Sequence, residues 1–478
     1  MTYTGPETCR WTACHAVEQL RLKKVSPQEL LSDAMARIDV VEPDINAIVT
    51  RCEDRARGQI DAGLPDYDGP GALYGLPIAI KDLNAVSGVR TTFATKGFAD
   101  FIPETSDPLV RRLEDRGAVI AGKTNTPEMG AGGNSTNAVF GATRNPWDTS
   151  KNAGGSSGGA AASLATGEVW LSHGSDLAGS IRTPAAYCGV VGLRTSPGRA
   201  GGGPALSAFQ GEALSGPMAR NVRDCALFLD AMTGFDPEMP LSIDAPKGGF
   251  QAALSKRRSP LRIAFSPDMD GFGDVEPEIE EVLTTAMQTL SQNGATIDTA
   301  CPDLSGLERT YTTLRGMHYA TLVDKQPDEI KQHFKETLRL NIKGGLAVTT
   351  DDIYAAFRDR TTLYHTMRLF LEDWDVLATA VVGIEPGPVE EEYPRVVKGR
   401  KITDYVNWLR FSFLSVVTTL PAISIPVGFT KSGMTVGLQL IGKPRGEAAL
   451  LVTADAIEQI LGIAKTLPID PIRGPVKA

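Results

Sequence analysis

Residues 154–159 read Gly-Gly-Ser-Ser-Gly-Gly, so that Ser156 and Ser157 stand between two pairs of glycines. Neither helix nor strand propensity explains this segment, because glycine at such density weakens both kinds of element. Glycine instead permits positive φ angles and a close approach of the backbone to another group. Taken alone, a glycine–serine cluster is more often a flexible loop. The Gly-Lys-Ser/Thr of a phosphate-binding turn does not follow, so we expect no nucleotide.

Two other segments carry unusual polar residues. Residues 174–185 read Gly-Ser-Asp-Leu-Ala-Gly-Ser-Ile-Arg-Thr-Pro-Ala and place Ser180 after a tight turn, in which converging N–H groups can stabilise an oxyanion. Residues 75–82 read Gly-Leu-Pro-Ile-Ala-Ile-Lys-Asp, and Lys81 ends this apolar strand. Lysine rarely occupies a buried position unless it is paired or functional. By itself, a lysine that reaches solvent at the end of a strand is an equally good interpretation.

Together, the three segments resemble the amidase signature family, and the spacing from Ser156 to Ser180 is the one that the family's Ser–Ser–Lys triad requires. The resemblance covers most of the chain and is densest from residue 75 to residue 194. The other matching segments are Gly-Lys-Thr-Asn at 122–125, Asn-Pro-Trp at 145–147, Cys-Gly-Val-Val-Gly-Leu at 188–193, Pro-Val-Gly-Phe at 426–429 and Gly-Leu-Gln-Leu-Ile-Gly at 437–442.

The resemblance implies that Ser180 is the nucleophile, that Ser156 is the bridging serine held in the family by a cis peptide bond, and that Lys81 is the base. Serine is a weak nucleophile unless its proton leaves during attack. Lysine accepts that proton only when it is neutral, so burial of Lys81 is expected to lower its pKa by several units. Ser156 would pass the proton from Ser180 to Lys81 and later return it to the leaving nitrogen.

Further site residues are implied by the same resemblance. The backbone N–H groups of the turn before and at the nucleophile are expected to form the oxyanion hole, and a polar pair with one neighbouring serine is expected to support the turn. The expected oxyanion-hole residues are Leu177, Ala178, Gly179 and Ser180; the supporting residues are Asp176, Arg182 and Ser157; and the substrate-binding residues are Met129, Gly130 and Asn134.

The turn departs from the common family pattern at one position. Most relatives have glycine where this chain has Ala178, and the segment 173–180 looks more like the branch that includes the 6-aminohexanoate cyclic dimer hydrolase and hydrolases of xenobiotic amides and carbamates. His173, which begins this segment, is expected to be a packed or hydrogen-bonded neighbour of the site. The added methyl group at position 178 would narrow the acyl pocket or require a negative φ angle.

The fold that the resemblance implies is α/β, with a central mixed sheet covered by helices on both sides. Apolar runs at 76–80 and 118–121 alternate with helical patterns, which agrees with this class. Ser26-Pro-Gln-Glu29 predicts a helix start with a capping box. We expect residues 1–478 to form a single domain, with a catalytic core at about 70–235 and an outer lobe that residues 240–400 can form.

Composition excludes several classes of function. The formal charge is −9, the pI is about 5.3, and the chain has no basic stripe, so a nucleic-acid partner is not expected. The six cysteines show no Cys-x-x-Cys spacing, which predicts reduced packing residues in a cytoplasmic protein. The five histidines form no zinc motif, and we expect neither a metal nor another cofactor. The uncharged stretch 411–429 contains two prolines and predicts a buried strand pair rather than a membrane span.

The sequence therefore predicts a free-standing hydrolase of amide C–N bonds, with carbamates (urethanes) and aryl esters as further substrates. The chain is expected to act on a small molecule as a monomer or homodimer. One alternative is the amidase subunit of a glutamine-dependent tRNA amidotransferase, which shares the triad. A second is a binding protein on the same scaffold, which the intact triad disfavours.

The expected substrate is a neutral, fairly bulky acyl donor such as an anilide or an aryl carbamate. Apolar residues near the core motifs can line its pocket, glycine-rich loops at 130–133 and 201–203 leave space, and no arginine lies at 126–134 to bind a carboxylate. An arginine from the outer lobe would change this expectation. The apolar candidates are Met129, Leu177, Phe140 and Phe209, and the arginines are Arg315, Arg358 and Arg360.

Overall fold

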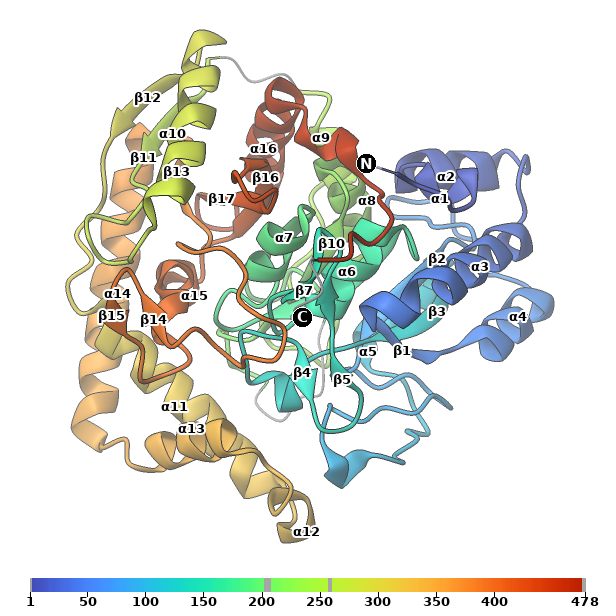
Figure 1. Cartoon of the computed structure of the whole chain (residues 1–478), viewed down its shortest axis with the longest axis horizontal. Coiled ribbons are helices and arrows are strands. Elements are labelled where there is room, and N and C mark those ends of the chain that lie inside the picture. Colours follow the sequence, from blue (N-terminus) through green and yellow to red (C-terminus); the bar gives the residue numbers. More distant parts are fainter. Residues whose placement is uncertain (1, 202–207, 257–259, 475–478) are drawn as a thin grey trace.

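The computed structural model describes residues 2–201, 208–256 and 260–474, and its centre is an 11-stranded sheet (Figure 1). The strand order is β1-β3-β2-β8-β10-β9-β16-β17-β13-β11-β12. These strands are β1 (Ile48–Arg51), β2 (Pro77–Lys81), β3 (Val119–Thr124), β8 (Leu171–Asp176), β9 (Val191–Arg194), β10 (Leu214–Ala219), β11 (Arg262–Phe265), β12 (Thr296–Thr299), β13 (Val376–Ala380), β16 (Ala422–Phe429) and β17 (Thr435–Ile441).

The sheet is mixed, as predicted. Strand β2 runs parallel to β3 and β8, and β11 runs parallel to β12 and β13, while the strands between these two groups pair antiparallel. Three short hairpins lie outside this sheet: β4 (Thr136–Asn137) with β5 (Gly141–Ala142), β6 (Arg144–Asn145) with β7 (Asp148–Asn152), and β14 (Val396–Val397) with β15 (Arg400–Lys401).

Helices cover both faces of the sheet. They are α1 (Glu7–Arg10), α2 (Ala13–Arg21), α3 (Pro27–Ile45), α4 (Glu53–Ala62), α5 (Pro108–Asp115), α6 (Gly158–Thr166), α7 (Arg182–Cys188), α8 (Val222–Met232), α9 (Gly249–Ala253), α10 (Pro277–Gln292), α11 (Leu307–Lys325), α12 (Asp328–Lys331), α13 (Glu336–Leu346), α14 (Thr350–Asp373), α15 (Phe413–Thr418) and α16 (Glu447–Leu461). The 3₁₀ turns are η1 (Lys96–Phe98), η2 (Glu128–Gly130), η3 (Asn407–Ser412) and η4 (Ile463–Thr466).

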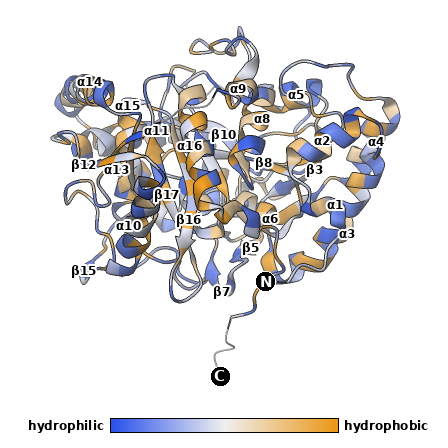
Figure 2. Cartoon of the chain, turned by 90° about the horizontal axis from the view of Figure 1, so that it is seen from above, coloured by the Kyte–Doolittle hydropathy of each residue, from blue (hydrophilic) through white to orange (hydrophobic). Residues whose placement is uncertain are grey.

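The alternation of side chains along the strands separates two hydrophobic cores. In β2, Ile78 and Ile80 pack into the core shared with α5, α8 and α16, whereas Ala79 faces the core shared with α4, α6 and α7. This period of two follows from the pleat of a strand. Figure 2 shows α16, in the middle of the molecule, as largely hydrophobic, while α14 at the rim carries both kinds of residue.

The first long helix begins as the sequence predicts. The Ser26 hydroxyl accepts a hydrogen bond from the Glu29 N–H at 3.2 Å, and the Glu29 carboxylate accepts one from the Ser26 N–H at 2.7 Å. This reciprocal capping box satisfies two N–H groups at the start of α3.

The prediction for residues 411–429 is wrong in its first half. The sequence predicts a strand pair, but Phe413–Thr418 forms helix α15, and only Ala422–Phe429 forms a strand, β16. Every residue of α15 is buried, and the helix contacts α11 and α14. This packing overrides the weak preference of Val416 and Val417 for strands.

The segment predicted to form an outer lobe contributes to two layers. Its strands β11, β12 and β13 extend the main sheet, whereas α11, α13 and α14 form a helical layer at one side of the molecule (Figure 1). Residues of this helical layer, including Tyr319 and Leu338, pack against Met129, Ala131 and Leu177. The outer helices therefore cover the loops that the sequence assigns to the site. Within the described residues, no helix combines the length and apolar character that a membrane crossing requires.

Two glycine substitutions test this packing. A Cβ at Gly216, in the central strand β10, would lie 2.1 Å from the backbone oxygen of Leu193, so we expect Gly216→Ala to lower the free energy of unfolding by about 1–3 kcal/mol or more. A Cβ at Gly58, inside α4, meets nothing within 4 Å, so Gly58→Ala should raise it by roughly 0.5–1 kcal/mol. Urea denaturation measures both changes, and equal stability of the two variants would contradict the described packing.

Candidate active site

Lys81 is the last residue of β2 and is completely buried. Its Nζ atom donates hydrogen bonds to three hydroxyl oxygens: Ser156 Oγ at 2.7 Å, Ser157 Oγ at 2.8 Å and Ser175 Oγ at 3.0 Å. The structure thus brings the predicted Lys81, Ser156 and Ser157 together. Ser175 was not predicted as a site residue. It lies near the end of β8, which runs parallel to β2, and this position could have indicated that it lies close to Lys81.

The surroundings of Lys81 favour the neutral amine. Burial lowers its pKa to about 7, and the negative charge of Asp176 opposes this shift. His173 is also buried, and its Nε2 lies 3.1 Å from the Ser215 hydroxyl. Burial and the positive charges of Lys81 and Lys123 lower the pKa of His173 to about 3, so the imidazole is neutral near pH 7. His173 is a packed and hydrogen-bonded neighbour, as expected.

The glycine–serine segment holds its serines against two other parts of the chain. The Gly155–Ser156 peptide bond is cis, and a Cβ at Gly155 would lie 2.7 Å from the backbone oxygen of Gly132, so this close approach requires glycine. The Ser157 N–H donates to the backbone oxygen of Ser180 at 3.0 Å. This bond joins the two serine segments.

The turn before Ser180 is organised around the carboxylate of Asp176. Arg182 binds this carboxylate through Nε and Nη2 at 3.0 and 2.8 Å, and the N–H groups of Gly179 and Ile181 donate to it at 3.0 and 3.1 Å. Burial alone would raise the pKa of Asp176, but Arg182 and then Arg194 hold the pKa of this carboxyl well below its usual range. The ionised carboxylate therefore fixes the shape of the turn.

This arrangement differs from the expectation for Gly179. The sequence places its N–H in the oxyanion hole, but here that N–H donates to Asp176. Among the described residues, none accepts a hydrogen bond from the N–H of Ala178 or of Ser180. These two groups are available to a ligand.

The expected substrate-binding residues lie beside the site, but the side chain of Asn134, whose backbone nitrogen would lie 2.9 Å from a Cβ at Gly155, is used elsewhere. Met129 packs in the cluster that contains Leu177, and a Cβ at Gly130 would lie 3.8 Å from Ser156 Oγ. Asn134 is only 1% exposed, and its amide nitrogen donates to the backbone oxygens of Val389 and Glu391 at 2.9 and 2.8 Å. Both of its N–H groups are therefore used to attach a distant loop.

Of the four apolar candidates, Met129 and Leu177 pack in the cluster described above, whereas the two phenylalanines have other surroundings. Phe209 is 78% exposed, and the Phe140 ring lies under the Arg90 guanidinium, 5.0 Å from it. Of the glycine-rich loop 201–203, residues 202 and 203 lie outside the described residues.

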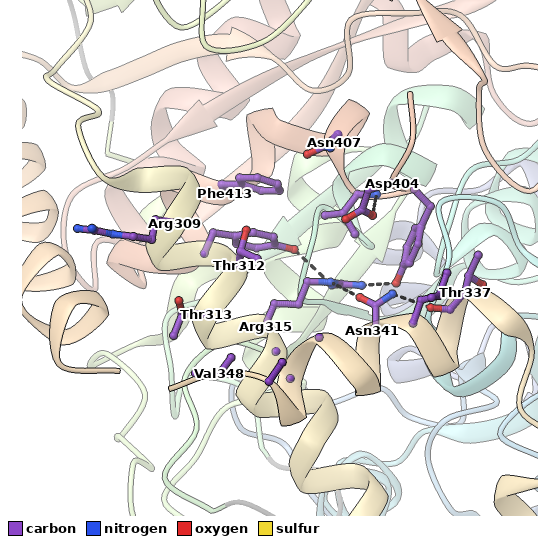
Figure 3. A pocket seen from close by; sticks show the side chains of 18 of the residues that line it. Arg309, Thr312, Thr313, Arg315, Thr337, Asn341, Val348, Asp404, Asn407 and Phe413 are labelled. Carbon is purple, nitrogen blue, oxygen red and sulfur yellow. Dashed lines mark hydrogen bonds between the residues drawn. The ribbon is translucent and has the colours of Figure 1, made fainter. Parts of the chain in front are cut away.

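A cavity of about 560 Å³ lies beside the turn, between α11, α13 and residues 393–413 (Figure 3). Its wall includes Arg315, Tyr311 and Phe413, and the Tyr311 hydroxyl donates to the backbone oxygen of Leu177 at 3.4 Å. Tyr311 therefore stands between the cavity and the turn that precedes Ser180, and none of the described residues that line the cavity belongs to that turn. Arg315 is one of the arginines that were expected to be able to enter the pocket from the outer lobe. Tyr311 was not predicted there, because its position depends on the packing of the outer helices.

The other two arginines named from the sequence do not line this cavity. Arg360 pairs with Glu212 at 2.8 Å, and Arg358 is exposed on α14. Among the described residues, no three or more His, Cys, Asp or Glu side chains gather in a way that could hold a metal ion.

A family model described as Amidase matches residues 29–451. The chain belongs to the amidase family. The resemblance stated from the motifs is thereby confirmed, as is the expected class of enzyme: the chain is an amidase, a hydrolase of carbon–nitrogen bonds.

Three relatives show how far the likeness to other amidases extends. The acylamidase of Rhodococcus erythropolis is 35% identical, over 94% of this chain and 95% of the relative. A glutamyl-tRNA(Gln) amidotransferase subunit from Moorella thermoacetica is 32% identical, over 94% and 96%. The solved structure of 6-aminohexanoate cyclic dimer hydrolase with substrate superposes with a TM-score of 0.85 at 28% identity, and the match covers 97% of this chain and 99% of that one.

The pKa of Lys81 predicts the pH dependence of the amidase reaction. Only neutral lysine accepts a proton, so kcat/KM for a neutral anilide should rise about tenfold per pH unit below a pKa of about 7 and level off above it. The profile is measured with 4-nitroacetanilide from pH 5.5 to 9, with enzyme returned from pH 5.5 to pH 8 as a control for denaturation. A rate that is flat or falls over this range would rule out the assignment of Lys81 as the base.

The Asp176–Arg182 pair predicts a large effect on stability. Asp176→Asn removes the negative charge that lies against the buried Arg182 guanidinium, so the free energy of unfolding should fall by about 3–5 kcal/mol. The folded-state pKa is depressed, so this contribution is present above the unfolded pKa of about 3.9 and is lost as pH falls below it.

Urea denaturation of Asp176→Asn and wild type should therefore differ by a constant amount between pH 5 and 8. Asp359→Asn, which breaks the exposed pair with Arg309, is the matched control and should cost less than about 1 kcal/mol. Equal losses in the two variants would contradict the described role of Asp176.

Proposed function

We propose that this amidase cleaves its substrate through an acyl-enzyme on Ser180, with Lys81 as the base and Ser156 as the proton relay. One observation carries the proposal. Lys81 is buried, its ammonium donates to three serine hydroxyls, and no carboxylate of the described residues lies within 4.0 Å of it. Burial lowers the pKa of this lysine to about 7, so near neutral pH part of it is the neutral amine, which can accept a proton.

The reaction begins when Ser180 Oγ attacks the carbonyl carbon of the amide. The Ser180 proton passes to Ser156 Oγ while the Ser156 proton passes to Lys81 Nζ. The negative charge that develops on the carbonyl oxygen is stabilised by the N–H groups of Ala178 and Ser180, with that of Leu177 as a third donor. The carboxylate of Asp176 keeps this turn in place without contacting the substrate.

The C–N bond then breaks as the proton returns from Lys81 through Ser156 to the leaving nitrogen, and the amine departs. Water then attacks the acyl-enzyme, and its proton passes through Ser156 to Lys81. The proton returns from Lys81 through Ser156 to Ser180 Oγ as the carboxylic acid leaves. The proton count on Lys81 is restored at the end of each half-reaction, so no cofactor is needed for the balance.

The substrate class we propose is a small-molecule amide, including anilides. Its support is the similarity to an acylamidase and to a hydrolase of a cyclic amide dimer. Carbamates and aryl esters undergo the same attack on a carbonyl carbon, and we include them as further substrates. The cavity of about 560 Å³ beside the turn falls in the size range of small-molecule sites. We propose that the active form is a monomer or homodimer.

The amidotransferase alternative is kept because one component of such a complex is 32% identical. The purified chain alone decides between the two functions. A free-standing amidase hydrolyses 4-nitroacetanilide without any partner, whereas a preference for glutamine that appears only with added partner proteins would support the alternative.

Substitution of the triad should have graded effects. We expect Ser180→Ala to lower kcat by roughly three to six orders of magnitude and to prevent acyl-enzyme formation, while Ser156→Ala and Lys81→Met should also be severe because each breaks the proton path. Turnover of 4-nitroacetanilide and mass spectrometry of the trapped acyl-enzyme measure both effects.

The matched control is Ser163→Ala. Ser163 is a buried serine of α6 whose hydroxyl, within the described part of the chain, donates only to the Ala160 backbone oxygen, at 3.0 Å. Its removal should therefore change kcat less than about twofold. Near-normal activity of Ser180→Ala would show that another residue is the nucleophile.

A further inference from the structure

Arg315 is a buried guanidinium that the proposed reaction does not use. It lies on α11, is 6% exposed, and among the described residues donates to neutral groups only. Nε donates to Asn341 Oδ1 at 3.0 Å, Nη1 to the Tyr311 hydroxyl at 3.3 Å, and Nη2 to the hydroxyls of Tyr319, at 3.4 Å, and Tyr405. Figure 3 shows the side chain reaching across the cavity between α11 and α13.

The positive charge of Arg315 has no partner of opposite charge nearby. Across the described part of the chain, no carboxylate lies within 4.0 Å of this guanidinium. The cavity wall contains two carboxylates, but Asp352 caps α14 through Thr349, and Asp404 accepts from the Val406 N–H at 2.9 Å. Burial of a charge is costly unless the charge is compensated. Arg182, by contrast, is buried against the carboxylate of Asp176.

The guanidinium also retains a free donor. Nη1 carries two N–H groups, and within the described residues it donates only to the Tyr311 hydroxyl. Arginine binds a carboxylate in a bidentate fashion through its planar set of donors, and such charge-assisted bonds are stronger than neutral ones. An anionic ligand in the cavity would supply both the missing charge and the missing acceptor.

The position of Arg315 connects it with the reaction site. Its Nη1 is bonded to the Tyr311 hydroxyl, which in turn donates to the backbone oxygen of Leu177 at 3.4 Å. The Tyr311 ring is stacked on Phe413, with centroids 3.6 Å apart, so this bridge is held firmly. The guanidinium is therefore two hydrogen bonds away from the turn that precedes Ser180. Both Arg315 and Tyr311 line the cavity, so a carboxylate bound at Arg315 would be separated from this turn by the Tyr311 side chain.

We propose that Arg315 is a specificity-determining residue that binds a carboxylate group of the substrate. This inference rests on the proposed amide hydrolysis and names its substrate class: amides that carry a carboxylate on either the acyl or the amine portion. It replaces the expectation of a wholly neutral substrate. That expectation depended on the absence of arginine from residues 126–134 and did not exclude an arginine that enters the pocket from the outer lobe.

Two pairs of substrates test the subsite and distinguish the two portions. For the acyl portion, glutaryl-4-nitroanilide is compared with 5-oxohexanoyl-4-nitroanilide, in which a methyl ketone replaces the carboxylate. For the amine portion, 3-acetamidobenzoate is compared with 3-acetamidoacetophenone. In the wild type we expect kcat/KM for the carboxylate to exceed that for its neutral counterpart by about 10- to 100-fold in one of the pairs.

Three variants show whether Arg315 causes this preference. Arg315→Met should lower the ratio of charged to neutral substrate by about tenfold or more, and Arg315→Lys should retain part of it because it keeps the charge but loses the bidentate geometry. Arg358→Met removes one positive charge from the exposed surface of α14 and should keep the wild-type ratio. Differences in overall activity cancel because each ratio is taken within one protein, and differences in leaving-group reactivity cancel when the ratios of the variants are compared with that of the wild type.

A wild-type ratio near one in both pairs, or an unchanged ratio in Arg315→Met, would overturn the proposal. If Arg315→Met does not fold, the wild-type ratios and Arg315→Lys decide the matter alone. Failure of the underlying function looks different, because the wild type would then hydrolyse neither the charged nor the neutral compounds. Cleavage of the neutral compounds without a preference for carboxylates would refute the subsite only.

Discussion

The burial of Lys81 is the constraint on which the rest of the site depends. Two lysines lie one register position apart near the ends of β2 and β3, where Lys123 is opposite Ile80. Their partners differ: Lys123 lies 2.9 Å from the carboxylate of Asp82, whereas Lys81 contacts serine hydroxyls. Burial lowers the pKa of both lysines, but the adjacent carboxylate of Asp82 opposes this shift for Lys123. The same sheet thus holds one lysine as a structural cation and the other as an amine that can change its charge.

The loop that carries the nucleophile depends on contacts that cross the sheet. Asp176, at the end of β8, binds Arg182 at the start of α7, and Arg182 also donates to Ser415 of α15 at 2.7 Å and to Gln439 of β17. Strands β8 and β17 are separated by three others in the sheet order. The arginine therefore fixes the turn against the second half of the sheet, and the turn keeps its shape only when both halves are folded.

The resemblance to the amidase signature family predicted the class of fold and the grouping of Lys81 with Ser156 and Ser157, while the start of α3 followed from a local pattern. The predictions were wrong where contacts between residues far apart in the sequence determine the structure. An apolar run such as 411–429 does not distinguish a buried helix from a strand, and Asn134 is held by backbone oxygens near residue 390. Of the three tyrosines around Arg315, Tyr311 and Tyr319 lie four residues before and after it on α11, but Tyr405 comes from a distant loop that no local pattern reveals.

The helical layer that packs on Met129 and Leu177 separates two tasks of the molecule. In the proposed function, the groups that move protons lie on strands and on the turns that follow them, while the cavity proposed to hold the substrate is lined largely by α11, α13 and the loop near residue 405. Such a division lets selection or directed evolution alter which compounds are accepted by exchanging residues in one continuous stretch of sequence. The chemistry is inherited unchanged, so new specificities can arise in few mutational steps.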